Sequence, residues 1–293
     1  MVENTNPLSK YYRQPAIYIT LPTKGKYYGP DVFTPTETGE IPVLPMNAKD
    51  ELAFKTPDAM ISGQATVDVI KSCIPNFKNP WQMTNYDTDT ILLAIRAATY
   101  GESMDITYTV PGTTEKVTQS ISVVQLLEGL KNTEIQDQFT TKDGFIVKVA
   151  PLNYKTLNRI QTAQYEQEKI YSTVRNSNLS EQQKGDQFVK SFKLLNDINF
   201  DLLVEAVTEI TTPEGVVVKD KEMIKEFCNN CEAKLVNEIQ NELGRVRMQA
   251  QIPPVKIQAT EEQIKLGAPV TYEIPVTFDN SNFSYNTTVK GQL

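Results

Sequence analysis

The chain has 293 residues, a formal net charge of −7 and no histidine. Its hydrophobic fraction of 40% is ordinary for a globular protein, so we expect most of it to bury a core. An acidic chain whose basic residues form no dense run repels a phosphate backbone, which argues against a nucleic-acid partner. Without histidine, the chain lacks the usual general base near neutral pH, the Ser-His and Cys-His nucleophile pairs and the commonest metal ligand.

The sequence also argues against a membrane partner. No run approaches the roughly 18 to 20 consecutive apolar residues that cross a bilayer, and the start, MVENTNPLSKYYRQ, lacks the apolar segment of a signal peptide. Three cysteines, an odd number, argue against a disulfide framework and agree with a reducing compartment. We therefore expect synthesis in a cytoplasm.

The amino-terminal segment is rich in tyrosine and proline. Residues 1–16 are predicted to form a flexible arm, because nothing apolar ties the chain down before Ile17. A strand is predicted over 16–21, and an edge strand over 40–46, where two prolines would remove ladder donors from a central strand. Tyrosine rings supply amphipathic contact area. The tyrosines that we expect to contact a partner are Tyr11, Tyr12, Tyr18, Tyr27 and Tyr28.

Three helices are predicted next. Asn47 is a plausible N-cap for AKDELAF, and an apolar stripe predicts a second helix from about Ser62. Asp87 or Asp89 is expected to cap the helix TDTILLAIRAATY, which Gly101 closes.

A hairpin over 104–110 and 115–119, a short helix SVVQLLEGLKN and a strand over 145–151 are predicted to complete an amino-terminal domain, residues 17–151. The next domain, residues 152–252, is predicted to be helical. Its three long helices are expected near 152–176, 180–210 and 220–248, with a capping box at Ser180 and a hairpin-like turn at TTPEGVVVK.

Two strands, VKIQA and TYEIPVTF, and a polar tail are expected in residues 253–293. The predicted fold class is therefore α+β: an amino-terminal domain of mixed strands and short helices, a long-helix hairpin or three-helix bundle, and a carboxyl-terminal β segment.

The order LPTKGKYYG, PVLPMNAKDE, TPDAMISG and YD…LLAIR..TYG, over about residues 17–110, resembles the T-even-type bacteriophage baseplate hub subunit family. The resemblance implies a subunit of the central hub of a contractile tail baseplate. It implies other hub and tail proteins as partners, the tape-measure protein among them, and assembly in the host cytoplasm before residence in the virion tail. It brings no active site and no cofactor. Some members carry a zinc-ribbon cysteine pair after TYG, but ESMDITYTVPGTTEK has none.

One cysteine pair, Cys228-Asn-Asn-Cys231, fits a pattern used for metal or redox sites. On the predicted helix both sulfurs fall on the apolar stripe, where free cysteine packs as a small hydrophobe. A structural zinc needs four ligands, and only Cys73 remains to join the pair. Core packing is therefore the favoured interpretation. A metal shared with a partner and a redox pair stay as alternatives, and no metal site is expected within the chain.

Two other patterns suggest sites only faintly. Asp87 and Asp89 could hold a cation, but a calcium loop needs more oxygen ligands over about twelve residues, so helix capping is favoured. Lys24 and Lys26 flank a glycine but lack the spacing of a phosphate-binding loop.

Two further candidate partner contacts, Arg96 and Trp81, each have an alternative structural interpretation. Arg96 is either a partner-binding cation or a core arginine paired with Asp50 or Glu51. The lone tryptophan, Trp81, either anchors a loop on the core or is an interface hot spot.

A structural or assembly role through protein contacts is the leading functional hypothesis, and no enzyme is expected. We expect the contacts to come from the arm, the exposed faces of the long helices and the polar tail. One alternative is a tail assembly chaperone that is absent from the mature virion. Another is a cell-wall hydrolase of the hub, although no motif locates the paired carboxylates that a glycosidase needs.

Overall fold

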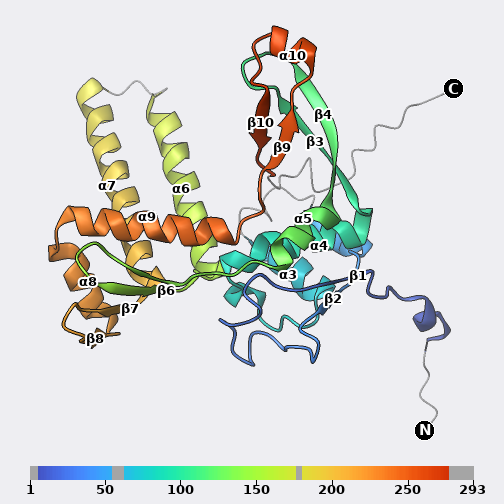
Figure 1. Cartoon of the computed structure of the whole chain (residues 1–293), viewed down its shortest axis with the longest axis horizontal. Helices are drawn as coiled ribbons and strands as arrows, with labels where there is room; N and C mark the ends of the chain where they lie inside the picture. Colours follow the sequence, from blue (N-terminus) through green and yellow to red (C-terminus); the bar gives the residue numbers. More distant parts are fainter. Residues whose placement is uncertain (1–5, 55–62, 176–179, 277–293) are drawn as a thin grey trace.

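The computed structural model describes residues 6–54, 63–175 and 180–276, and within them small antiparallel sheets alternate with helices (Figure 1). This arrangement confirms the predicted α+β class. The predicted TPDAMISG turn, the RNSNLS linker and the polar tail lie wholly or mostly outside the described residues. Within those residues, no helix is both long enough and apolar enough to span a bilayer.

The central unit packs helices against a two-stranded antiparallel sheet. Ile19 and Ile41 of the sheet are buried in one cluster with Ile70 of helix α3. Pro42 lies opposite Tyr18 in this isolated pair of strands, so the predicted edge position of the proline-containing strand is confirmed. The elements of the unit are β1 (Ile17–Ile19), β2 (Ile41–Val43), α1 (Ala48–Phe54), α3 (Gln64–Cys73), η2 (Pro80–Gln82) and α4 (Asn85–Tyr100).

The amino terminus of α1 has the cap that its sequence predicts. The Asp50 N–H donates to Asn47 Oδ1 at 2.9 Å, and the Asn47 N–H donates back to Asp50 Oδ2 at 3.0 Å. This reciprocal pair satisfies two of the backbone groups that a helix end leaves open.

The start of α4 differs from the prediction. The helix begins at Asn85 with Thr84 as its N-cap, so the expected capping by Asp87 or Asp89 is wrong. The reason is tertiary: Thr84 forms a bridge with Asn153, and the Asn85 N–H donates to the Leu152 carbonyl at 2.9 Å. Because the chain enters α4 from this bridge, the helix starts two residues before the first aspartate.

Asp87 instead holds a loop against α4. Its carboxylate is fully buried and accepts hydrogen bonds from the Thr23 N–H (3.0 Å) and hydroxyl (2.5 Å), the Tyr28 hydroxyl (2.6 Å) and the Thr84 hydroxyl (3.3 Å). The Thr84 N–H in turn donates to the Tyr28 oxygen at 3.1 Å. Burial raises the pKa of Asp87, and the hydrogen bonds from Thr23 and Tyr28 oppose that shift.

The carboxyl-terminal strands pack on a hairpin from the first half of the chain, beside it in Figure 1. Met104 and Ile106 share a buried cluster with Ile257 and Tyr272, and the rings of Tyr108 and Tyr272 lie 6.0 Å apart. The predicted hairpin, short helix and closing strand pair are confirmed. The elements are β3 (Ser103–Thr109), β4 (Lys116–Ser122), α5 (Val123–Lys131), β9 (Val255–Gln258), α10 (Glu261–Lys265) and β10 (Thr271–Ile274).

The remaining elements form a helical unit on a four-stranded antiparallel sheet of order β5-β6-β7-β8. The capping box predicted at Ser180 is present. The strand predicted over 145–151 is β6, and TTPEGVVVK is the β7–β8 hairpin. β6 pairs with β7 across the domain boundary predicted after residue 151. The strands are β5 (Gln138–Thr140), β6 (Ile146–Val149), β7 (Val207–Thr211) and β8 (Val217–Val218), and the helices are α6 (Tyr154–Arg175), α7 (Glu181–Ala206), α8 (Lys221–Asn230) and α9 (Ala233–Gln249).

The helices α6 and α7 form the expected hairpin. The third helix, predicted as one continuous element near 220–248, is instead two helices, α8 and α9. It breaks at Cys231, whose backbone is extended, and resumes as α9 after Glu232. Two asparagines precede the break, and asparagine side chains compete for backbone hydrogen bonds and favour helix ends. Leu235 and Ile239 of α9 share a buried cluster with Leu203 of α7.

We predict that Asp87→Ala lowers the free energy of unfolding by about 2 to 4 kcal/mol, because it leaves one buried N–H and three buried hydroxyls without their acceptor. Asp87→Asn should cost less, since its carbonyl oxygen still accepts. Urea denaturation measures both changes. Asp105→Ala, at an exposed strand position, is the control and should stay within about 0.5 kcal/mol of the parent. Equal effects of the two alanine variants would contradict the role given to Asp87.

Candidate interaction surfaces

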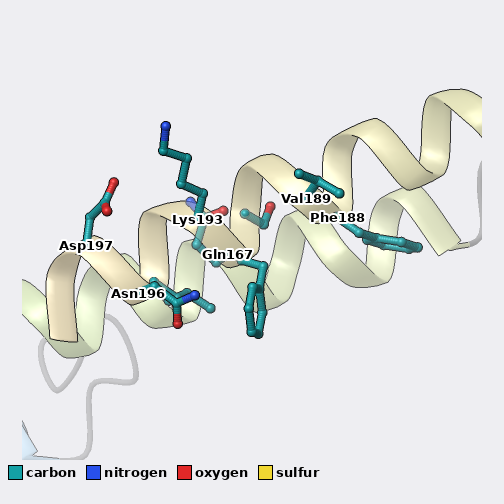
Figure 2. A pocket seen from close by; sticks show the side chains of 9 residues that line it. Gln167, Phe188, Val189, Lys193, Asn196 and Asp197 are labelled. Atoms are coloured by element: carbon teal, nitrogen blue, oxygen red, sulfur yellow. The ribbon is translucent and has the colours of Figure 1, made fainter. Parts of the chain in front are cut away.

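The α6–α7 hairpin carries an exposed apolar groove (Figure 2). Val189 and Phe192 on α7 are 69% and 67% exposed. With Phe188, Leu195 and Gln167 they line a groove with a volume of about 680 Å³. We call this surface the hairpin groove. The hairpin projects from the rest of the protein in Figure 1, so the groove is accessible to a partner.

Sequence reasoning named the faces of the long helices but not these residues. A signal was present: α7 has more apolar side chains than one stripe facing α6 requires. The surplus is exposed on both helices of the hairpin. Its members are Tyr165, Ile170, Val189, Phe192 and Leu194.

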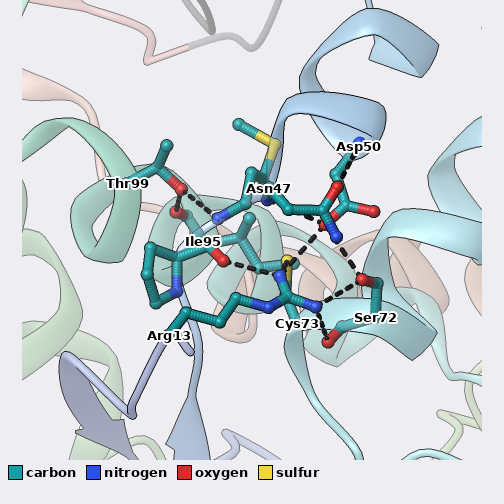
Figure 3. Close-up of polar contacts among 9 residues, drawn as sticks. Arg13, Asn47, Asp50, Ser72, Cys73, Ile95 and Thr99 are labelled. Atoms are coloured by element: carbon teal, nitrogen blue, oxygen red, sulfur yellow. Dashed lines mark hydrogen bonds and ion pairs between the residues drawn. The ribbon is translucent and has the colours of Figure 1, made fainter. Parts of the chain in front are cut away.

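Two residues anchor the described part of the arm: the Ala16 N–H donates to the Val43 carbonyl at 2.9 Å, and Arg13 makes several contacts. The Arg13 guanidinium donates to the Pro45 carbonyl at 2.6 Å, to Asp50 Oδ2 at 3.0 Å and to the carbonyl and hydroxyl of Ser72 at 2.8 and 2.6 Å (Figure 3). The cation that pairs with Asp50 is therefore Arg13, so Asp50 is not the partner of Arg96 and the Glu51 alternative stays a prediction. The flexibility expected of residues 1–16 stays a prediction, but the carboxyl-terminal end of this arm is held in place by Arg13.

Three of the tyrosines expected to contact a partner are exposed. Tyr11 and Tyr12 lie at the end of a short exposed 3₁₀ helix, η1 (Pro7–Tyr11), which lies away from the body in Figure 1. Tyr18 is exposed on β1. Tyr11, Tyr12 and the exposed Leu8 share one short segment near the amino terminus, which we call the arm surface.

The other two tyrosines, Tyr27 and Tyr28, make hydrogen bonds within the protein. The Tyr27 hydroxyl donates to Asp137 at 2.9 Å, and the Tyr28 hydroxyl donates to Asp87. The Tyr28 ring packs on Phe77 with centroids 5.4 Å apart, and burial raises its pKa well above the usual 10. Both side chains hold the LPTKGKYYG loop on the protein.

Trp81 and Arg96 also make internal contacts. The Trp81 ring lies 5.7 Å from that of Tyr154, which fits the loop-anchor alternative. Arg96 is 5% exposed, donates to the Ser103 carbonyl at 2.9 Å and lies over the Tyr100 ring at 5.9 Å. Arg96 therefore joins α4 to β3.

The cysteine pair lies at the carboxyl-terminal end of α8. Cys228 is buried on α8, whereas Cys231 is its half-buried C-cap, and all three cysteines are free. No group of three or more metal-ligating side chains occurs in the part of the chain that the structure describes. Burial raises the pKa of Cys228 to about 11 and that of Cys73 to about 12.

We predict that a thiol reagent at pH 8 labels Cys231 of the native protein first. A pKa of about 11 leaves roughly one Cys228 thiol in a thousand ionised at that pH, and only the thiolate reacts. Cys228 and Cys73 should become labelled on unfolding in urea, as peptide mass spectrometry would report. Fast native labelling of Cys228 would contradict the buried environment assigned to it.

We also predict that Val189→Ser/Phe192→Ser changes the free energy of unfolding by less than about 1 kcal/mol, because both side chains are already in solvent. The double variant should bind less of the apolar dye ANS than the parent. Leu266→Ser/Val270→Ser is a matched pair of exposed apolar residues outside the groove. A large loss of stability in the groove variant would mean that the groove is part of the core.

Comparison with known proteins assigns the family. A family model described as T4 bacteriophage base plate protein matches residues 17–266. Neither a curated protein nor a solved structure matches the chain. The match extends well beyond the region of the initial resemblance, through the α6–α7 hairpin and the closing strands. The chain therefore belongs to the T4 bacteriophage base plate protein family and is a component of the phage tail baseplate.

Proposed function

We propose that this baseplate protein is a structural or assembly subunit of the central hub and that it binds its neighbours through the hairpin groove. The observation that carries the proposal is the exposure of Val189 and Phe192 on a hairpin that projects from a packed body. Aromatic side chains in a concave apolar surface are typical anchors of protein interfaces. The family match supports baseplate partners.

The arm surface is the second contact region in this proposal. Arg13 fixes one end of the arm, while Tyr11, Tyr12 and Leu8 remain exposed before it. An extended segment of this kind can lie along a neighbour with its rings in grooves. The tape-measure protein is one candidate neighbour, and assembly in the host cytoplasm belongs to the same proposal.

The proposed role involves no bond chemistry. Asp87 is the most deeply buried acid described, and its oxygens are engaged by four internal donors, so it does not face a cleft. The hairpin groove holds a single carboxylate, Asp197, whereas glycoside hydrolysis uses two. These features favour a structural role over the hydrolase alternative.

The test is complementation of a phage that lacks the gene, with the parent chain or with Val189→Ser/Phe192→Ser. Two hot-spot truncations of about 2 kcal/mol each lower affinity by a factor on the order of 1,000, so we expect few complete tails from the groove variant. Leu266→Ser/Val270→Ser should support normal tails. Mass spectrometry of purified particles should find the parent chain in the baseplate.

Three outcomes would overturn parts of this proposal. Normal tail yield with the groove variant would remove the groove as the contact surface. Absence of the parent chain from complete particles would favour the assembly chaperone. A lytic band in a peptidoglycan gel with the purified chain would favour the hydrolase.

A further inference from the structure

The charged side chains on one exposed flank of α7 are separated by sign. Lys190 and Lys193 come first along the helix, Asp197 and Asp201 follow, and all four residues are exposed. At about 100° per residue, the four lie within roughly 80° of one another around the helix axis, so they share one flank. Figure 2 shows Lys193 and Asp197 pointing to the same side of α7. This flank therefore has a positive half and a negative half.

The chain itself leaves most of these charges without a partner. Among the described residues, no hydrogen bond or ion pair of the Lys190, Lys193 or Asp197 side chains is found. Asp201 pairs with Lys225 through Oδ1 at 2.9 Å, but its side chain is 61% exposed. Both halves of the flank are therefore accessible to a neighbouring molecule.

Apolar side chains lie beside this charged flank on both helices of the hairpin. Val189 and Phe192 are exposed on α7, and Tyr165 and Ile170 are exposed on α6. Two antiparallel helices cannot bury all of this surface against each other. In an antiparallel four-helix bundle, a second helical hairpin covers such surface, so the α6–α7 hairpin corresponds to half of a bundle.

The order of the charges favours a second copy of the same hairpin. At 1.5 Å per residue, Lys193 and Asp197 lie about 6 Å apart along the axis, and Lys190 and Asp201 about 16 Å apart. The midpoint of each pair falls next to Leu195. A two-fold axis at that position places each lysine of one α7 opposite an aspartate of an antiparallel copy. Such self-complementarity is what a two-fold contact between identical surfaces requires.

Other arrangements fit the flank less well. A parallel copy of α7 would place lysine opposite lysine and aspartate opposite aspartate. A foreign helix with charges of one sign would meet a like charge on one half of the flank, and like charges across an interface act against a partner.

We propose that the occupant of the hairpin groove is a second copy of this chain, whose α7 packs antiparallel to the first about a two-fold axis near Leu195, so that two hairpins form a four-helix bundle. The inference rests on the contact function proposed above for the groove and identifies the neighbour. Val189 and Phe192 supply the apolar burial. The Lys193–Asp197 and Lys190–Asp201 pairs add little affinity, as exposed ion pairs do, but set the orientation and register.

The test is sedimentation velocity of the purified full chain over about 1 to 500 μM. We expect a monomer–dimer equilibrium with a dissociation constant on the order of 10 to 100 μM, as befits a small interface. Lys190→Glu/Lys193→Glu makes the flank wholly acidic, and Asp197→Lys/Asp201→Lys makes it wholly basic. Each variant alone should have a dissociation constant roughly tenfold higher or more, because like charges then face each other.

An equimolar mixture of the two variants should dimerise as the parent does, because every facing pair again has opposite charges. Lys116→Glu/Lys265→Glu, at exposed positions outside the hairpin, gives the same change in net charge as the acidic variant and should also dimerise like the parent. Val189→Ser/Phe192→Ser should weaken the dimer, because it removes apolar surface from the contact.

A parent chain that stays monomeric up to about 500 μM would overturn the inference. A mixture of the acidic and basic variants that dimerises no better than either one alone would overturn it as well. If the parent is monomeric and the groove variant still gives few tails, the groove binds a different subunit and the hub proposal stands. If the parent dimerises and the groove variant gives normal tails, the dimer stands and the groove is not needed for assembly.

Discussion

The buried carboxylate of Asp87 is the interaction on which the central unit depends. A charge in this position has no cation beside it in the hydrogen-bond network described above, so its desolvation must be offset by donors. Those donors come from Thr23 and Tyr28 of the loop and from Thr84 at the start of α4. One carboxylate therefore fixes the loop, the helix start and, through the bridge of Thr84 to Asn153, the entry into α6.

The same loop connects the central unit to the helical unit. Tyr27 and Lys26 both donate to Asp137, just before β5, and these bonds lower the pKa of that acid although burial opposes them. β6 then pairs with β7, which follows α7 in the chain. The α6–α7 hairpin is thus held at its base by a sheet and by the Asp87 network. A rigid base lets the exposed groove be presented at a fixed position, which lowers the entropic cost of binding a neighbour.

The two proposed contact regions differ in how firmly the rest of the protein holds them. The hairpin groove lies on long helices, whereas the arm surface lies on a short exposed segment that Arg13 anchors at one end. In the proposed function, the subunit therefore combines a rigid contact surface with an orderable one.

The sequence by itself determined the features that depend on local residue chemistry: caps, tight turns and proline positions. The Asn47–Asp50 cap, the Ser180 capping box, the β3–β4 hairpin and the edge position of Pro42 follow from local chemistry. The fold class followed from the order of these elements, and the family resemblance in the first third of the chain pointed to the baseplate.

The tertiary structure decided which residues meet. The sequence predicts Asp87 to be a helix cap. In the structure its carboxylate accepts hydrogen bonds from Thr23 and Tyr28, which lie 64 and 59 residues away in the chain. Arg13, which reads as part of a loose arm, pairs with Asp50, and Arg96 is used inside the chain. Exposure of Phe192 likewise depends on whether another helix covers that face of α7. Local propensity and periodicity cannot encode these outcomes, because a buried polar group takes whichever partner the packing of distant segments brings within hydrogen-bond distance.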